Sequence, residues 1–265
     1  MSKLLVKPKG RHGRVTKVTP KSAGWTYVGF ELYRLAPGET VTGGKENREA
    51  CLVWVTGKGT ASAGGADFGS LGGRMSPFDG PPAAIYVPAG TDWQVTAETD
   101  LELAICTAPD KVRDLPARVI AQDKLTKETR GKGTNTRFVT NILPEGEPAQ
   151  SLLVVEVITP GGHTSSYPPH KHDRDDLPRE SLLEETYYHR LNPPQGFAFQ
   201  RVYTDDRSLD EAMAVEDGDV VLVPEGYHPC AACHGYDLYY LNVMAGPKRT
   251  WKFHNAPEHA WLMQA

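Results

Sequence analysis

Short strand-like segments separated by glycine and proline turns are the feature that most constrains the fold of this chain. These segments are rich in Val, Ile, Leu, Tyr and Phe, and they include WTYVGFELYRL, ACLVWV, LLVVEVITPGG, DVVLVPEGY and DLYYLNVMAG. Such residues favour pleated strands, and no stretch has the pattern of a long amphipathic helix. With 26 Gly and 21 Pro available for turns, the pattern predicts an all-β chain of antiparallel barrels or sandwiches rather than an α/β fold.

The length of the chain predicts two such modules. At 265 residues, the chain exceeds one average domain, and each half is long enough to bury a core of its own. A segment rich in Lys, Arg, Asp and Thr interrupts the strand pattern from about Pro109 to Gly133. We therefore predict an N-terminal barrel over residues 1–112, a linker over 113–135 and a C-terminal barrel over 136–265.

Composition argues against several classes of partner. The formal charge is −4 at pH 7, and no basic stripe is present that would attract nucleic acid. No apolar run approaches the roughly 20 residues that span a bilayer. The first residues, MSKLLVKPKGRHGR, lack the apolar stretch of a secretory signal. We expect a cytoplasmic protein with no nucleic-acid partner and no membrane partner.

The four cysteines are consistent with a reducing compartment. Cys51 and Cys106 lie in apolar strand-like runs, where a buried thiol is the common state. The sequence CAACH at 230–234 formally matches a haem attachment motif, and its Cys-x-x-Cys pair could also indicate redox or zinc chemistry. Because no export signal and no second cysteine pair accompany it, we interpret Cys230 and Cys233 as loop thiols.

A candidate metal site begins in the segment SYPPHKHD. Its two prolines hold the backbone extended, so His170 and His172 lie two apart on a strand and point to the same face. An isolated His-x-His pair is more commonly a polar surface strand. The pair becomes informative only with further ligands later in the chain.

Two later segments supply such ligands. Thirteen residues after His172, the run LLEETYYHR contains Glu185, while its neighbour Glu184 points to the opposite face. The run GDVVLVPEGYHP then leads through a strand and a tight Pro-x-Gly turn to His228. Neutral imidazole and carboxylate suit Zn, Mn, Fe or Ni. We predict one divalent metal ion with the ligands His170, His172, Glu185 and His228.

These residues resemble the two motifs of the cupin barrel, His-x-His-(x)n-Glu and Gly-x5-Pro-x-Gly-(x)n-His. The resemblance implies an all-β bicupin fold of two double-stranded β-helix (jelly-roll) barrels. One departure is the long gap between His172 and Glu185, which leaves Glu184 as a rival ligand. We favour Glu185 because it is in phase with the strand and shares a face with Tyr187. The first half has GGKENREA in place of His-x-His and Thr-Asp-Trp after its Pro-x-Gly turn, so we predict a barrel without metal ligands there.

A finer resemblance covers most of the chain. The segments SSYPPHKHD, LEETYYHR, QGFAFQRVYTDDRSLDE, GYHP and GYDLYYLNVMAGPKRTWKFHNAPEHAW look like the 5-deoxy-glucuronate isomerase family of inositol catabolism, which is related to ketol-isomerases of pectin-derived uronates. This resemblance implies conversion of 5-deoxy-D-glucuronate to 5-dehydro-2-deoxy-D-gluconate, with a small sugar acid as the binding partner. Zn is the metal we favour.

Isomerisation by proton transfer would need a group within hydrogen-bond reach of the substrate. Tyr187, on the face of Glu185, and Tyr240 are our candidates for catalytic residues, although either could equally be a barrel-filling aromatic side chain. The substrate carboxylate calls for a fork of donors, and Arg201 in AFQRVY is our candidate. An arginine on a strand is, however, more commonly a solvated outer-face residue.

Two alternatives from other functional classes use the same scaffold. A cupin dioxygenase would bind iron with the same ligands and consume oxygen, and a non-catalytic sugar-acid-binding cupin would form no product. We also expect a homo-oligomer, because exposed barrel edges commonly pair with a second copy.

Overall fold

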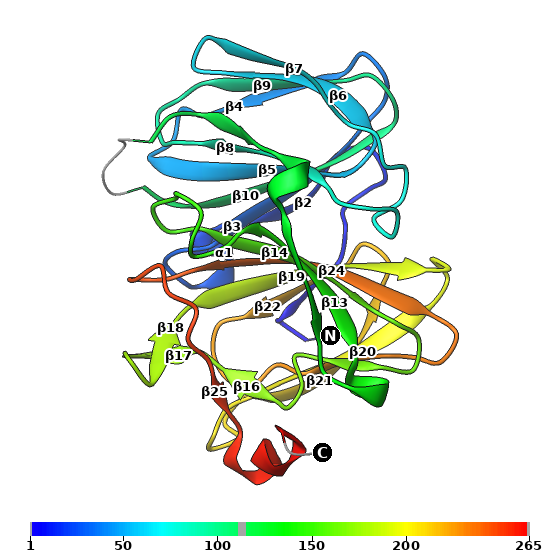
Figure 1. Ribbon diagram of the computed structural model, residues 1–265, viewed down its shortest axis with the longest axis vertical. Coiled ribbons are helices and arrows are strands. Elements are labelled where there is room, and N and C mark those ends of the chain that lie inside the picture. Colours follow the sequence, from blue (N-terminus) through cyan, green and yellow to red (C-terminus); the bar gives the residue numbers. More distant parts are fainter. Residues whose placement is uncertain (1, 111–114, 264–265) are drawn as a thin grey trace. The chain divides into compact units, whose positions relative to one another are not determined.

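The computed structural model describes residues 2–110 and 115–263, and it consists mainly of antiparallel strands (Figure 1). The chain divides into two compact units. Unit 1 comprises Met1–Lys7, Lys127–Thr140 and Glu156–Ala265, and unit 2 comprises Pro8–Thr126 and Asn141–Val155. The predicted all-β class is confirmed. In the described residues, no helix is both long enough and apolar enough to cross a membrane.

Unit 2 contains a six-stranded sheet in the order β11-β8-β5-β10-β3-β2 and a four-stranded sheet in the order β4-β9-β6-β7. The strands of the larger sheet are β2 (Gly13–Val18), β3 (Gly29–Leu35), β5 (Arg48–Thr56), β8 (Ala83–Val87), β10 (Leu101–Pro109) and β11 (Arg118–Ile120). Those of the smaller sheet are β4 (Thr40–Gly43), β6 (Lys58–Ala63), β7 (Ala66–Gly72) and β9 (Trp93–Ala97). The short helices α1 (Pro20–Ala23) and η1 (Gln122–Lys124) complete the unit.

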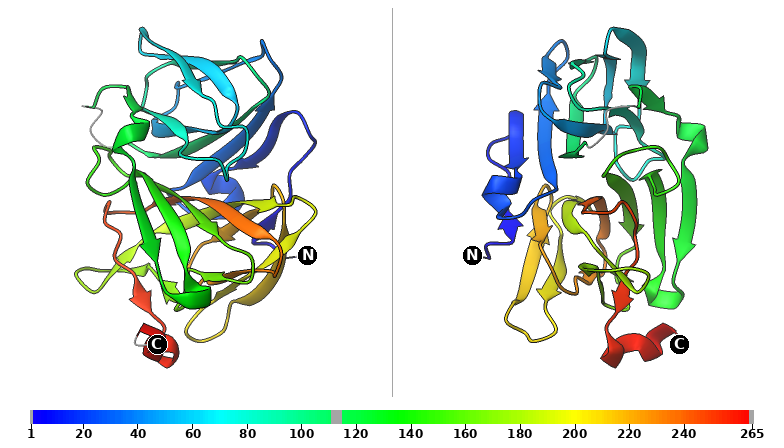
Figure 2. Two further views of the ribbon diagram at one scale, coloured as in Figure 1. Left: turned by 45° about the vertical axis from the view of Figure 1, so that its right-hand side comes forward. Right: turned by 90° about the vertical axis from the view of Figure 1, so that its left-hand side faces the viewer.

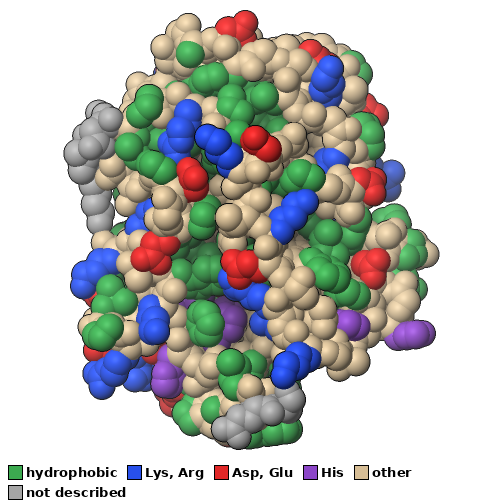
Figure 3. All heavy atoms as spheres, viewed as in Figure 1, with side chains coloured by type: hydrophobic (Ala, Val, Ile, Leu, Met, Phe, Trp, Pro, Cys, Tyr) green, Lys and Arg blue, Asp and Glu red, His purple; other side chains and the backbone are tan. Residues whose placement is uncertain are grey.

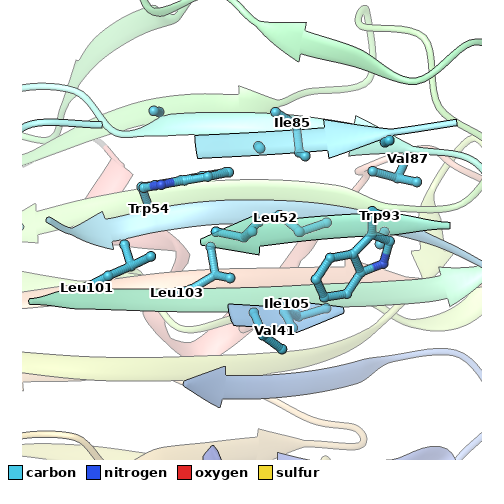
Figure 4. Close-up of a cluster of buried hydrophobic side chains, with 14 of the residues drawn as sticks. Val41, Leu52, Trp54, Ile85, Val87, Trp93, Leu101, Leu103 and Ile105 are labelled. Carbon is cyan, nitrogen blue, oxygen red and sulfur yellow. The ribbon is translucent and has the colours of Figure 1, made fainter. Parts of the chain in front are cut away.

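The core of unit 2 is built from alternate residues of strands in both sheets (Figure 4). Because successive strand residues face opposite sides, every second side chain of β5 and β10 enters this core. Those residues are Ala50, Leu52 and Trp54 on β5 and Leu101, Leu103 and Ile105 on β10. The indole ring of Trp93, on β9, lies so close to Gly43 that an added Cβ there would collide with it. Glycine is therefore required at that position.

Unit 1 contains larger and smaller sheets of the same kind. The seven-stranded sheet has the order β1-β22-β19-β24-β14-β13-β12, and a four-stranded sheet has the order β15-β23-β20-β21. The larger sheet comprises β1 (Leu5–Val6), β12 (Thr126–Arg130), β13 (Arg137–Leu143), β14 (Leu153–Thr159), β19 (Glu184–Asn192), β22 (Val220–Val223) and β24 (Asp237–Ala245). Residue 126 of β12, residues 141–143 of β13 and residues 153–155 of β14 are assigned to unit 2. The smaller one comprises β15 (Thr164–Ser165), β20 (Phe197–Tyr203), β21 (Asp210–Glu216) and β23 (Cys230–Ala232).

Two short two-stranded sheets complete unit 1. β16 (His170–Lys171) pairs with β25 (His254–Asn255), and β17 (Asp173–Asp176) pairs with β18 (Glu180–Leu182). Short helices η2 (Gly133–Asn135) and η3 (Pro257–Met263) precede β13 and follow β25. Figure 2 shows the C-terminal segment (red) running through β25 into η3. The tail thus lies beside the strand that carries His170.

The core of unit 1 continues along the inner faces of β19 and β24. Tyr187 and Leu191 of β19 pack with Leu238 and Tyr240 of β24. Side chains of β13, β14, β20, β21, β22 and β23 close the same cluster, namely Val139, Val157, Ala198, Val202, Met213, Val215, Val221, Val223, Cys230 and Ala232. Tyr187 and Tyr240 are therefore both inner-face residues of one barrel.

The two units differ from the predicted domain limits in specific places. The predicted linker, 113–135, contains β11, η1, β12 and η2, and its first two residues lie outside the described part. The first residues of the chain pair with the second half, since Leu5 lies opposite Val221, and Lys7 Nζ is 2.7 Å from Asp219 Oδ2. Strand pairing between distant segments sets these limits, and composition alone does not report it.

Candidate metal centre

Three histidines of unit 1 converge on one point. His170 lies on β16, His172 follows that strand, and His228 follows β22. One ring nitrogen from each lies within 4.8 Å of the others. The ring centroids of His170 and His172 are each 4.9 Å from that of His228. Among the described residues, 2–110 and 115–263, these three histidines form the group of possible ligands whose nitrogen atoms are close enough together to hold a metal ion.

The turn after β22 delivers His228 through a position that only glycine can occupy. Gly226 has a φ of 86°, and an added Cβ would collide with the carbonyl oxygen of Tyr203. The next residue, Tyr227, forms two backbone hydrogen bonds with Tyr203, of 2.8 and 2.9 Å. The Pro-x-Gly turn is therefore pinned to β20, and the His228 side chain enters the barrel.

Glu185 is the carboxylate that the fold brings to the histidines. Its Oε2 atom lies 3.3 Å from His172 Nε2 and 3.2 Å from His228 Nε2. Glu185 pairs with Val223 of β22 and Met244 of β24. Because neighbouring strand residues face opposite sides, Glu184 points away from the cluster.

Backbone acceptors fix the orientation of two of the imidazoles. His172 Nδ1 lies 3.0 Å from the Leu183 carbonyl, and His228 Nδ1 lies 2.8 Å from the Gly226 carbonyl. Each carbonyl accepts the Nδ1 hydrogen, which leaves the Nε2 lone pair directed at the cluster. Burial lowers the pKa of His228 to about 4. The ring is thus neutral at neutral pH, as a metal ligand must be.

The convergent atoms lack other partners. His172 Nε2, His228 Nε2 and Glu185 Oε2 are buried and have no hydrogen-bond partner in the described structure. A buried polar atom without a partner costs about 1–3 kcal/mol, so three at one point need an explanation. A divalent cation bound by imidazole nitrogens and a carboxylate oxygen provides one. The residues present therefore fit a metal ion.

His170 is the accessible member of the cluster. Its side chain is partly exposed, whereas His172 and His228 are buried. The Phe253 ring lies 4.6 Å from the His170 ring, and His170 pairs with Asn255 of β25. On the face shown in Figure 3, histidine side chains (purple) reach the surface among hydrophobic and basic side chains. The C-terminal tail thus contacts the partly exposed His170.

Tyr187 and Tyr240 line the barrel beside the histidines. The Tyr187 ring is 5.8 Å from the His228 ring and 4.9 Å from the Tyr240 ring. The hydroxyl of Tyr187 is 2.8 Å from Ser166 Oγ, and that of Tyr240 is 2.6 Å from Ser165 Oγ. Burial raises the pKa of both phenols well above the usual range. Both hydroxyls are therefore protonated at neutral pH and can donate a hydrogen bond.

The structure does not bring Arg201 to the cluster. Its guanidinium forms two hydrogen bonds to Asp210, of 2.7 and 2.6 Å, on the outer face of β20. The inward residue is Gln200, which is 1% exposed and lies 2.9 Å from His189 Nε2. A one-residue step along a strand reverses the face. Phe199, on the other side of Gln200, is exposed like Arg201. The alternation of inward and outward residues along this strand was the signal available in the sequence.

Arg137 is a basic residue near the cluster that the sequence motifs do not indicate. It begins β13, two residues before the core residue Val139, and so shares the inner face of that strand. Its charge helps to lower the pKa of His170, after desolvation and the two other histidines. The alternation of Arg137, exposed Phe138 and buried Val139 was the available signal, but these residues directly follow the predicted linker, where no strand pattern was expected.

Unit 2 has no comparable cluster in the described residues. A cavity of about 830 Å³ opens there, lined by aromatic, basic and acidic side chains that include Trp93, Arg48 and Glu31. The four cysteines are free thiols. Cys230 lies on β23 rather than in a loop, and burial raises the pKa of its thiol to about 12. The CAACH segment therefore contributes to the core of unit 1.

Two β-barrel units, one of which carries a three-histidine cluster with an adjacent glutamate, define a bicupin protein. A Lactobacillus farciminis oxalate decarboxylase, in its formate complex, has the same fold, with a TM-score of 0.66 and 12% identity over 100% of this chain and 91% of that chain. The family model described as the KduI/IolB family matches residues 4–262. The chain belongs to that family, which confirms the resemblance found in the sequence.

More similar proteins cover the whole chain. A 5-deoxy-glucuronate isomerase of Geobacillus kaustophilus is 55% identical over 100% of this chain and 97% of its own length. A second, from Geobacillus thermodenitrificans, is 56% identical over 96% of this chain and 92% of its own length. The crystal structure of an IolB-like protein from Salmonella typhimurium superposes with a TM-score of 0.97 and 53% identity, covering 98% of this chain and 99% of that one.

Proposed function

We propose that the protein is an aldose–ketose isomerase that converts 5-deoxy-D-glucuronate to 5-dehydro-2-deoxy-D-gluconate in myo-inositol catabolism. The observation that carries the proposal is the set of buried, unpartnered nitrogen and oxygen atoms at the three-histidine cluster. It occurs in a chain that is 48–56% identical, over nearly its whole length, to relatives named for this activity. The substrate is a small sugar acid.

In this proposal His170, His172, Glu185 and His228 hold one divalent metal ion. Zn is favoured because a set of imidazoles and one carboxylate matches its usual ligands, while Mn, Fe and Ni are alternatives. A bound cation would polarise the C1 carbonyl and the C2 oxygen and so stabilise negative charge that develops on them. The backbone carbonyls behind His172 and His228 keep the two rings in the orientation this requires.

The tyrosines have a proposed role as donors. Isomerisation moves one hydrogen from C2 to C1 and one proton from O2 to O1. Tyr187 and Tyr240 remain protonated because burial raises their pKa, so a phenol hydrogen can be donated to a substrate oxygen. Ser166 and Ser165 hold the two hydroxyls in position. Arg201, paired with Asp210 outside the barrel, has no part in this arrangement.

We further propose a cytoplasmic homo-oligomer. Four free thiols suit a reducing compartment. The edge strands β7 and β21 of the two four-stranded sheets are of the kind that commonly pair with a second copy. Light scattering of the purified protein would give the number of subunits.

The central test is turnover by the purified protein under anaerobic conditions. We expect 5-deoxy-D-glucuronate to yield the ketose, followed by proton NMR, with about one metal ion per chain by elemental analysis. A His170→Ala/His172→Ala double variant should lose both metal and turnover. The control is His12→Ala, which removes an exposed histidine of unit 2 that pairs with Glu39.

Three outcomes would contradict the proposal. Equal rates in the wild type and the double variant would exclude a role for the cluster. Product formation only in the presence of oxygen, with oxygen consumed, would indicate a dioxygenase. A thermal shift on adding the sugar acid without any product would indicate a binding protein.

A further inference from the structure

Arg137 is an arginine on the inner face of unit 1, next to the candidate metal centre. On β13 the side chain of Phe138 is 48% exposed, whereas that of Val139 is 3% exposed and packs with Tyr187 and Tyr240. Because side chains alternate along a strand, Arg137 lies on the same face as Val139. The guanidinium is therefore directed into the barrel that contains the histidines.

A set of hydrogen bonds holds this guanidinium in place. Arg137 Nη1 donates to the carbonyl oxygen and to the side-chain oxygen of Asn135, at 3.0 and 3.1 Å. Asn135 is fixed in turn, because its Nδ2 donates to the Tyr167 carbonyl at 3.1 Å and its Oδ1 accepts from Thr164 Oγ1 at 3.2 Å. A side chain at Gly131 would come within 2.8 Å of Nη1. One end of the guanidinium is thus anchored.

The Nε and Nη2 atoms of the guanidinium carry N–H donors that these two bonds do not use. An arginine carries five N–H donors, and the two bonds to Asn135 use only Nη1. In the described part of the chain, no carboxylate forms an ion pair with Arg137. Arg130, the basic residue that shares its surroundings, is by contrast paired with Glu128 at 2.9 Å. Burial is the main cause that lowers the pKa of Arg137, and the charge of Arg130 adds to it.

A half-buried cation without a counter-ion is unfavourable unless a ligand supplies the negative charge. The two serines that orient the tyrosines follow directly after Thr164, which donates to Asn135, the residue that holds Arg137. An anion bound at Arg137 would therefore be placed in a fixed position relative to the two phenols.

We propose that Arg137 binds the carboxylate of the sugar acid through its Nε and Nη2 donors, and so makes the enzyme selective for acids over neutral sugars. This inference rests on the proposed isomerase function. The carboxylate is at the opposite end of the six-carbon substrate from C1 and C2. Anchoring it at Arg137 leaves those two carbons for the histidine cluster.

The experiment compares two substrates that differ only in the carboxylate, 5-deoxy-D-glucuronate and 5-deoxy-D-glucose, in the wild type and in Arg137→Met. We expect kcat/KM for the acid to fall by about 100-fold, mainly through KM, while kcat/KM for the neutral sugar changes by less than about threefold. Arg137→Lys keeps the charge but not the planar fork and should lose about tenfold for the acid. If Arg137→Met does not fold, Arg137→Lys provides the same comparison.

The matched control is Arg190→Met, which removes an arginine from the outer face of β19, where it pairs with Asp217 at 2.8 Å. It should retain the preference for the acid. Equal losses for both sugars in Arg137→Met, with an unchanged circular dichroism spectrum, would indicate a structural role and overturn the inference. Full retention of the acid preference would overturn it as well.

Calorimetric titration of 5-deoxy-D-glucuronate into the metal-loaded protein separates this inference from the proposed function. If the wild type binds the acid without forming the ketose, the isomerase proposal fails. The role of Arg137 is then read from the loss of affinity, which we expect to be about 100-fold in Arg137→Met. If the wild type binds no acid, both proposals fail.

Discussion

At the scale of single residues, the candidate site depends on which of two neighbours faces the barrel. Glu185 Oε2 lies 3.2–3.3 Å from two imidazole nitrogens, whereas the side chain of Glu184 points to the opposite face of the same strand. Gln200 and Arg201 are related in the same way on β20. Chemical type suggested the candidates, but side-chain direction separates them.

Glu185→Gln should weaken metal binding by about 100-fold, because an amide oxygen carries no charge to offset that of the cation. Glu184→Gln should change the affinity by less than about threefold. Competition between each protein and a zinc chelator measures the dissociation constants. Weaker binding in Glu184→Gln than in Glu185→Gln would reverse the assignment.

His189 should make the protein less stable in acid. Burial lowers the pKa of His189 to about 4 from 6.5, so the unfolded chain takes up this proton at a higher pH than the folded one. The contribution of His189 to the free energy of unfolding is therefore complete above pH 6.5 and is lost as the pH falls toward 4. The shift corresponds to about 3 kcal/mol.

We predict a shallower loss of stability between pH 6.5 and 4 in His189→Phe than in the wild type. Urea unfolding of metal-free samples at several pH values measures it. The variant also loses the bond to Gln200, so the slope with pH, and not the stability at one pH, is the informative quantity. Parallel slopes would show that His189 does not titrate in this way.

At the scale of elements, the site is assembled by connections between short strands. β16 places His170 beside β25 of the C-terminal tail, β19 contributes Glu185, and the turn after β22 contributes His228. The sequence motifs identified the histidines in order. The pairing of the C-terminal tail with β16 could not be predicted, because two-residue strands carry too little sequence pattern.

Gly226→Ala tests the turn that positions His228. The positive φ disfavours any side chain by about 1–3 kcal/mol, and the collision with the Tyr203 carbonyl adds to that cost. We expect a loss of more than about 3 kcal/mol in unfolding free energy, together with a reduced metal content. Gly162→Ala is the matched control, since φ is 83° there but the surrounding space is open.

Urea unfolding of both variants measures the loss of unfolding free energy, and elemental analysis measures their metal content. The control should lose only about 1 kcal/mol and keep its metal. Equal effects in the two variants would mean that backbone strain alone, rather than the contact with β20, determines the position of His228.

At the scale of the whole molecule, the two units have similar strand architecture but different chemistry. Unit 2 has a core of hydrophobic side chains such as Leu52, Trp54 and Leu103, whereas unit 1 also holds polar groups around the histidines in its interior. Buried polar groups reduce stability unless they are paired. Unit 1 should therefore depend on the metal, while unit 2 should not.

Removal of the metal with a chelator should lower the stability of unit 1 by about 4 kcal/mol when free metal had been present at roughly 1,000 times its dissociation constant. Hydrogen exchange followed by mass spectrometry can locate the change. We expect faster exchange in β16, β22 and the turn to His228, with exchange in β5 and β10 unaltered. Uniform acceleration across both units would contradict a local role for the metal.

The sequence by itself determined the strand-rich class, because strand alternation and Gly or Pro turns are local patterns, and it placed the candidate ligands His170, His172 and His228 in recognisable motifs. Tertiary structure decided which other side chains point toward the histidine cluster. Glu185 rather than Glu184, Gln200 rather than Arg201 and the inward position of Arg137 all depend on how a strand is paired with distant strands. A one-residue change in that pairing reverses every side chain, and local sequence does not fix it.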